Sequence, residues 1–215
     1  MTEGIKGVIF DVDGVLLDSM EIWTDLGARY LTSLDREPEK GLAEVLFSMS
    51  MEQGAEYLTE RYSLGLTPEE VMDGLSGMLR DFYFYEVGAK PGAAALMKRF
   101  REEGIRMTAA TSSPAEHVAR ALERNGLLGY LDRIFTVAET GASKHSPEIY
   151  DRAAVFMGTS RDETLVFEDS LYALRTAAEA GYRTVGVFDA KGETDQKGME
   201  ETAEIYIRDL SEMLR

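Results

Sequence analysis

The chain contains no cysteine among its 215 residues. Disulfides and thiolate metal sites are therefore excluded, which is what we expect of a protein from a reducing compartment. The sequence also lacks any apolar run long enough to span a bilayer, and its first residues, MTEGIKGVIF, lack the basic and long apolar segments of a signal peptide. We expect a cytoplasmic protein that does not bind membranes.

Positive charge is also scarce. The sequence has 23 Lys and Arg residues against 39 Asp and Glu residues, which gives a net charge of -16. Such a charge opposes binding to the phosphates of nucleic acids or to anionic membranes. An anionic substrate would have to be bound locally, by a divalent cation and a few basic side chains. Most of the acidic residues must simply lie on solvated helix faces.

Short, nearly uniformly apolar runs recur along the chain, at residues 5–10, 104–110, 133–137, 164–168 and 183–188. Amphipathic helical patterns lie between them, at residues 91–104, 113–126, 146–158 and 170–181. Apolar strands that alternate with helices are typical of parallel strands covered on both faces. The sequence therefore predicts an α/β fold with a doubly wound parallel sheet.

Residues 19–86 show no strand pattern and carry amphipathic helical patterns instead, over 19–34, 51–62 and 67–85. One interpretation is a long helical crossover, but several helices in a row favour a separate small domain. We expect an all-helical cap domain over 18–86, inserted into a core domain formed by 1–17 and 87–215. The acidic stretch at 192–204 is expected to form a surface loop and a helix.

Two aspartates, Asp11 and Asp13, follow the first predicted strand, at the edge where open α/β sheets place their ligands. Two close, buried carboxylates repel each other unless a proton or a cation compensates them, and Mg²⁺ prefers oxygen ligands. A calcium loop is excluded, because Val15 and Leu16 stand where that template needs a ligand and a glycine. Turn capping would explain one aspartate, but not the pair together with three later signals.

The three later signals also follow predicted strands: the hydroxyl cluster Thr111–Ser113, the lysine Lys144 and the acidic pair Glu168–Asp169. A hydroxyl followed by backbone amides at a helix start forms an anion cradle, a lysine supplies positive charge, and a second acidic pair completes a metal site. Taken singly, each has an ordinary structural explanation, such as a helix cap or a solvated lysine. Their order along the chain indicates a phosphate site with a metal ion.

The segments FDVDGVLLDS, AATSS, ASK and VFEDS resemble the four motifs of the haloacid dehalogenase-like (HAD) hydrolase superfamily. The resemblance covers essentially the whole chain. It is to the group with a helical cap after the first motif, the β-phosphoglucomutase-like phosphatases. It implies a Rossmann-like core, phosphoryl chemistry and Mg²⁺ as the cofactor.

The resemblance also implies the roles of the first two aspartates. Asp11 would be the nucleophile that forms an aspartyl phosphate, a covalent route open to a carboxylate. Asp13 would protonate the leaving alcohol and then accept a proton from water, while its backbone carbonyl binds Mg²⁺. The dehalogenases of the superfamily lack this second aspartate, so Asp13 favours phosphate chemistry.

The remaining roles are also carried over from the family. The expected metal ligands are Asp11, Asp13, Glu168 and Asp169, although Glu168 could instead orient Lys144. The expected substrate-binding residues are Gly14, Thr111, Ser112, Ser113 and Lys144, of which Thr111 and Lys144 also belong to the catalytic set because they stabilise the transferring group. Gly14 and Asp18 lie in the loop toward the cap, where we expect a hinge.

Three reactions of the superfamily compete. The mutases carry a histidine where this chain has Trp23 and a Lys-Asn pair where it has Pro114 and Ala115, so a mutase is the alternative to a hydrolase. A phosphonatase needs a desolvated cap lysine, and Lys40 lies in the acidic segment LDREPEKGLAE. We expect hydrolysis of a small phosphate monoester, a sugar or polyol phosphate, by a monomer or weak dimer. The non-enzyme alternative is a catalytically silent binding module.

A few aromatic residues have no assigned role. Trp23 and the stretch 82–85 could line a substrate-facing cap surface, but their helical spacing favours packing inside the cap. His117 is expected to be structural, and His145 is expected to be a loop residue beside Lys144.

Overall fold

The computed structural model describes residues 3–47 and 49–214. Its contacts divide the chain into two compact units, one formed by Met1–Asp18 and Val87–Arg215 and the other by Ser19–Glu86. The first division lies one residue after the boundary that the sequence suggested. The two units are described separately below.

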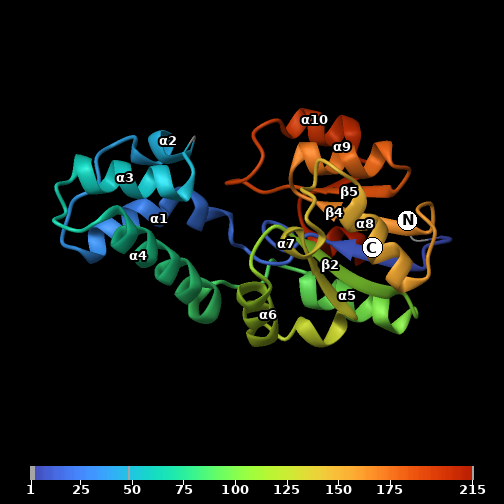
Figure 1. Ribbon diagram of the computed structural model, residues 1–215. Coiled ribbons are helices and arrows are strands. Elements are labelled where there is room, and N and C mark those ends of the chain that lie inside the picture. Colours follow the sequence, from blue (N-terminus) through green and yellow to red (C-terminus); the bar gives the residue numbers. More distant parts are fainter. Residues whose placement is uncertain (1–2, 48, 215) are drawn as a thin grey trace. The chain divides into compact units, whose positions relative to one another are not determined.

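The first unit is built on a six-stranded, wholly parallel sheet with the strand order β3-β2-β1-β4-β5-β6 (Figure 1). The strands are β1 (Gly7–Phe10), β2 (Arg106–Thr111), β3 (Arg133–Thr136), β4 (Thr164–Glu168), β5 (Arg183–Val187) and β6 (Ile205–Ile207). This confirms the doubly wound α/β fold. The sequence did not predict the edge strand β6, because it has only three residues and follows the acidic stretch.

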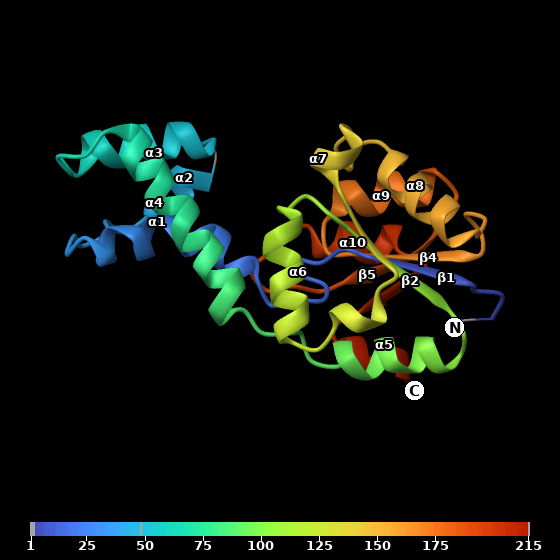
Figure 2. The same cartoon turned by 60° about the horizontal axis from the view of Figure 1, so that its bottom comes forward.

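Helices cover both faces of this sheet, and Figure 2 shows α5 on one side with α8 and α9 on the other. The helices of the unit are α5 (Ala93–Glu102), α6 (Ala115–Arg124), α7 (Val137–Thr140), α8 (Glu148–Met157), α9 (Leu171–Glu179) and α10 (Gln196–Thr202). Two 3-10 turns, η2 (Leu128–Tyr130) and η3 (Leu210–Leu214), complete it. The four helices expected from the amphipathic patterns are present, and α10 occupies the acidic stretch.

Strand register brings the expected site segments to one edge of the sheet. Phe10, the last residue of β1, pairs with Ala109 of β2 and with Phe167 of β4. The amide of Asp11 then donates to the carbonyl of Phe167 over 2.9 Å. Beneath this edge the rings of Phe10 and Phe167 pack with centroids 4.8 Å apart, in a core from which water is excluded. The packed sheet therefore holds the backbone of the residues that follow β1, β2 and β4 in place.

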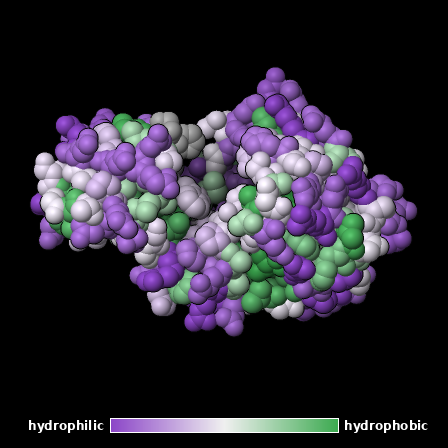
Figure 3. All heavy atoms as spheres, viewed as in Figure 1, coloured by the Kyte–Doolittle hydropathy of each residue, from purple (hydrophilic) through white to green (hydrophobic). Residues whose placement is uncertain are grey.

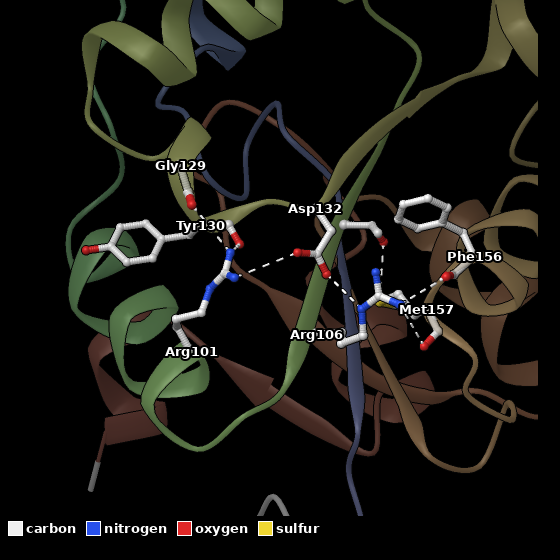
Figure 4. Close-up of polar contacts among 8 residues, drawn as sticks. Arg101, Arg106, Gly129, Tyr130, Asp132, Phe156 and Met157 are labelled. Atoms are coloured by element: carbon white, nitrogen blue, oxygen red, sulfur yellow. Dashed lines mark hydrogen bonds and ion pairs between the residues drawn. The ribbon is translucent and has the colours of Figure 1, made fainter.

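At the opposite end of the strands, arginine side chains bind several backbone and side-chain acceptors (Figure 4). Arg106, the first residue of β2, donates from Nε to Asp132 Oδ2 over 2.9 Å. Its Nη1 donates to the carbonyls of Phe156 and Met157, at the end of α8, over 3.1 and 3.2 Å. Arg101 donates to the carbonyl of Tyr130. Planar guanidinium groups bind several acceptors at once, so they tie α5, α8 and the loop before β3 to β2.

The second unit is entirely helical over its described residues, with α1 (Met20–Ser33), α2 (Leu42–Phe47), α3 (Met51–Arg61), α4 (Pro68–Asp81) and a π-helical turn η1 (Phe82–Glu86). Capping boxes begin α3 at Ser50 and α4 at Thr67, where side chain and backbone satisfy each other's polar groups. The short helix α2 was not predicted. That this unit acts as a cap domain remains a prediction.

A cavity of about 320 Å³ lies inside the second unit, lined mainly by apolar residues of α1 and α3. Trp23 lines it and is 41% exposed, whereas Phe82 and Tyr83 are buried and Tyr85 is largely exposed. The side chains of Trp23 and Tyr85 are thus exposed to solvent. Phe82 and Tyr83 are buried inside the unit, as their helical spacing suggested.

Hydrophilic residues cover most of the face drawn in Figure 3, with smaller apolar areas between them. Over the residues that the structure describes, no helix has the length and apolar character needed to cross a membrane.

Candidate active site

Lys144 lies at the centre of a buried cluster of charges at the carboxyl edge of the sheet. Its Nζ is 2.6 Å from Asp11 Oδ1 and 2.7 Å from Glu168 Oε1. The side chain of Lys144 is only 3% exposed, and that of Glu168 is fully buried. Charges held this far from water interact strongly, because little solvent screens them. One ammonium group therefore bridges the residue after β1 and the last residue of β4.

Tyr150, on α8, is a member of this cluster that the sequence analysis missed. Its hydroxyl donates to Glu168 Oε1 over 2.7 Å, so this oxygen accepts from both Lys144 and Tyr150. The residue is fully buried. A tyrosine on the core face of an amphipathic helix needs a partner for its hydroxyl, and that was the signal available in the sequence.

Asp11, Glu168 and Asp169 each offer a carboxylate oxygen within 4.8 Å of the others. All three residues are buried. The pKa of Asp11 is raised to about 7, mainly by burial and also by the neighbouring Glu168 and Asp13, while Lys144 opposes the shift. Burial also raises the pKa of Asp169 well above its usual range, with Asp11 and Glu168 adding to the effect. These carboxylates hold their protons more tightly than usual, because the buried site has too little positive charge to compensate them when they are ionised.

The pKa of Lys144 responds to two opposing effects. Burial by itself lowers the pKa of this ammonium, but the carboxylates of Asp11 and Glu168 raise it above its ordinary value. Lys144 is therefore charged at any physiological pH and compensates part of the negative charge of the cluster.

The hydroxyl cluster after β2 lies against Asp13. Ser113 Oγ donates to Asp13 Oδ2 over 2.6 Å, and the amide of Ser113 donates to Thr111 Oγ1 over 3.0 Å. Thr111 and Ser113 are buried, whereas Ser112 is exposed. The structure thus brings the second aspartate of the first motif and the second motif together.

The turn after Asp13 depends on Gly14, which has a φ of 76°. Such a positive φ is accessible to glycine at no steric cost. The Gly14 amide donates to the carbonyl of Leu17 over 3.0 Å and closes the turn. Asp18 lies apart from the charged cluster: its side chain is exposed, and its amide donates to the carbonyl of Gly88.

His145 and Tyr172 stack beside the cluster, with ring centroids 4.4 Å apart. Tyr172 is 42% exposed, and burial together with Glu168 raises the pKa of its hydroxyl. His145 is exposed, as expected for a loop residue. Sequence reasoning did not place Tyr172 near the site, because Tyr172 lies outside the four motifs, two residues beyond the end of VFEDS.

The donor set fits a hard divalent cation. Three carboxylates converge, two of them with a raised pKa, and oxygen ligands of this kind suit Mg²⁺. Glu168 faces Lys144 with Oε1, while its Oε2 lies 3.5 Å from Ser170 Oγ. Glu168 therefore orients Lys144 through Oε1, and its role as a metal ligand stays a prediction.

The comparison with known proteins assigns the class. A family description for haloacid dehalogenase-like hydrolases matches residues 5–181, so the chain belongs to this family. It is similar to YhcW of Bacillus subtilis, which is named as a phosphatase, with 29% identity over 84% of this chain and 82% of that protein. It also resembles a Thermotoga maritima protein named phosphorylated carbohydrates phosphatase, with 23% identity over 84% of each chain.

The fold is shared with a solved Thermotoga maritima structure described as a β-phosphoglucomutase. That structure has a TM-score of 0.85 and 23% sequence identity, and the match covers 96% of each chain. The chain is an enzyme of the HAD-like phosphatase family, which agrees with the class that its four motifs indicated.

Proposed function

We propose that this protein is a Mg²⁺-dependent phosphohydrolase that cleaves a small phosphate monoester through an aspartyl-phosphate intermediate. The observation that carries the proposal is the buried Lys144 bridge between Asp11 and Glu168, beside a third buried carboxylate, Asp169. A phosphoryl group held there would meet a nucleophile, a fixed ammonium and the expected metal ligands.

The first half of the reaction is the transfer of the phosphoryl group to Asp11. A carboxylate oxygen of Asp11 forms a bond to phosphorus while the bond from phosphorus to the ester oxygen breaks. Asp13 donates its proton to that oxygen, which leaves as an alcohol. Ser113 holds Oδ2 of Asp13 during this step through the 2.6 Å hydrogen bond.

The second half is hydrolysis. Asp13 takes a proton from a water molecule, the water oxygen bonds to phosphorus, and the bond to Asp11 breaks. Lys144 and the amides and hydroxyl of Thr111–Ser113 bind the phosphoryl oxygens in both halves, where charge builds up. Mg²⁺ held by Asp11, Asp169, Glu168 and the Asp13 carbonyl would supply further positive charge to those oxygens.

Water is the proposed acceptor rather than a second hydroxyl of a sugar. A mutase must hold a second phosphate, and the family's Lys-Asn pair for that purpose is replaced here by Pro114 and Ala115. These two residues are exposed at the start of α6 and carry no charge. Trp23 replaces the mutase histidine and lines the cavity of the second unit.

A sugar or polyol phosphate is the proposed substrate class. The name of the Thermotoga maritima relative, phosphorylated carbohydrates phosphatase, supports it. The single ammonium of Lys144 in the buried cluster matches one phosphoryl group, which suits a monoester.

The test is a screen of phosphate release from sugar, polyol and nucleotide monophosphates, with Mg²⁺ and after its removal by a chelator. We expect Mg²⁺-dependent release by the native chain and none by Asp11→Asn. Asp162→Asn, which changes an exposed aspartate in the turn before β4, is the matched control and should keep full activity. Retained turnover in Asp11→Asn would overturn the nucleophile assignment. Faster conversion of β-glucose 1-phosphate to glucose 6-phosphate than release of phosphate from any ester would favour the mutase.

A further inference from the structure

Lys90 makes an unusual set of contacts in the segment by which the chain returns to the sheet after residue 86. Its ammonium donates to the carbonyl of Gly14 over 2.8 Å, to the carbonyl of Phe188 over 3.2 Å and to Asp189 Oδ2 over 2.6 Å. The side chain of Lys90 is 14% exposed and that of Asp189 is 4% exposed. All three donors of an ammonium group are thus used in a largely buried place.

Both carboxylate oxygens of Asp189 accept hydrogen bonds. Its Oδ2 accepts from Lys90, and its Oδ1 accepts from the amide of Lys191 over 2.8 Å. The loop that Asp189 begins passes close to Asp169, because a Cβ on Gly192 would stand 3.1 Å from Asp169 Oδ2 and 3.3 Å from Asp189 Cβ. Further along, Glu193 Oε2 accepts from the amide of Leu171 at the start of α9. Lys90 therefore anchors a loop that packs beside Asp169.

The contact with Gly14 matters most for chemistry. A glycine adopts positive and negative φ about equally well, so the backbone after Asp13 has no intrinsic preference for the conformation observed. A charged donor on the Gly14 carbonyl selects one of these conformations. The returning segment supports the same turn through its backbone, since the Lys90 amide donates to the carbonyl of Leu16 over 2.9 Å.

We propose that Lys90, paired with Asp189, is a positioning residue for Asp13: by holding the Gly14 carbonyl it aims the Asp13 carboxylate at the leaving group and at the attacking water. This inference rests on the proposed hydrolase function. Lys90 does not touch the phosphoryl group, and it acts through the turn. Small displacements of an acid or base from the reacting atoms reduce rates by large factors.

The experiment separates the two halves of the reaction by choice of substrate. p-Nitrophenyl phosphate has a leaving group that departs without a proton, whereas glycerol phosphate needs an acid. For Lys90→Met with p-nitrophenyl phosphate, we expect a rapid burst of one nitrophenol per active site followed by slow turnover, because the base that activates water is misplaced. For glycerol phosphate we expect kcat to fall about 10- to 100-fold with KM nearly unchanged.

A merely structural role would give a different result. If Lys90→Met only reduces the amount of folded enzyme, the burst amplitude falls because fewer active sites react. The ratio of the burst rate to the steady-state rate stays that of the native chain, because each folded molecule works normally. The double variant Lys90→Met/Asp189→Asn removes the unpaired buried carboxylate that Lys90→Met leaves behind. It should regain thermal stability and keep the kinetic defect. Lys90→Arg retains the charge and should restore part of the lost rate.

Lys98→Met is the matched control, because Lys98 is 65% exposed and pairs with Glu102 on the surface of α5. It should behave as the native chain. The reference is Asp13→Asn, which should show the same pattern as Lys90→Met in stronger form. The inference fails if Asp13→Asn shows this pattern while Lys90→Met and the double variant match the native rates. If the native chain releases phosphate from neither substrate nor from any ester of the screen described above, the proposed function itself fails.

Discussion

The carboxylate of Glu168 accepts hydrogen bonds from three neighbouring residues. Its Oε1 accepts from Lys144 and from Tyr150, while Oε2 is directed to the side of Ser170. A buried carboxylate needs several partners to offset the loss of its water shell. The hydroxyl of Tyr150 therefore supports the orientation of Glu168 and, through it, the position of Lys144.

Tyr150→Phe tests this support. The change removes one hydrogen bond to a charged acceptor and leaves the ring packing intact, so we expect the free energy of unfolding to fall by about 1–2 kcal/mol. We also expect a several-fold lower kcat, because Lys144 loses part of its fixed geometry. Urea unfolding and phosphate release measure the two effects. Tyr85→Phe, at a side chain that is 68% exposed, is the control and should change neither.

At the scale of the elements, helix α5 depends on a close approach that only glycine permits. Gly92, directly before α5, has a φ of 82°, and a Cβ there would stand 2.6 Å from the amide nitrogen of Ser211 in η3. Gly104, just beyond the other end of α5, has a φ of 75°, yet a Cβ there would meet no heavy atom within 4 Å. The two glycines share a backbone conformation and differ in their surroundings.

Replacing each glycine by alanine separates the cost of backbone strain from the cost of a steric clash. Gly104→Ala carries only the strain of the left-handed conformation, and we expect it to lower the free energy of unfolding by about 1 kcal/mol. Gly92→Ala must also displace backbone, so we expect a loss of about 3 kcal/mol or more. Thermal or urea unfolding measures both. If Gly92→Ala and Gly104→Ala lower the free energy of unfolding equally, α5 and η3 can move apart without cost.

The elements also show which parts of the fold are readable from local sequence. The strands β1 to β5 were predicted from short apolar runs, and β1 and β4 are buried over their whole length. The short helices α2 and α7 and the edge strand β6 were not predicted. Elements of only a few residues carry too little periodicity, and their contacts with the rest of the unit stabilise them.

At the scale of the whole molecule, the large negative charge and the buried carboxylate cluster link stability to pH and to cations. The pKa of Asp11, raised by burial from 3.8 to about 7, means that the native protein keeps a proton that the unfolded chain has already released. Without a cation, this group therefore stabilises the native state fully below about pH 4, and the contribution is lost as pH rises toward 7.

A divalent cation competes with that proton. We expect Mg²⁺ to raise the melting temperature more at about pH 8 than at about pH 5.5, because at the lower pH binding must first displace a proton. Melting curves with and without Mg²⁺ across this range measure the effect. Asp11→Asn removes one of the two carboxyls whose pKa is raised and should weaken the pH dependence of the Mg²⁺ effect, with Asp169 responsible for what remains. A gain that is independent of pH in the native chain would contradict the assignment of Asp11 to the cation site.

The sequence by itself determined the parallel sheet, the helical stretch of residues 19–86 and the positions of the site segments at strand ends. These features follow from local patterns, since apolar runs, caps and motifs are each written in a few consecutive residues. Only the tertiary structure decided which side chains meet. Ser113 contacts Asp13 from 100 residues away, and Lys90 contacts Asp189 from 99 residues away. Such pairs depend on how strands and loops pack, and the raised pKa of Asp11 depends on the burial that this packing creates.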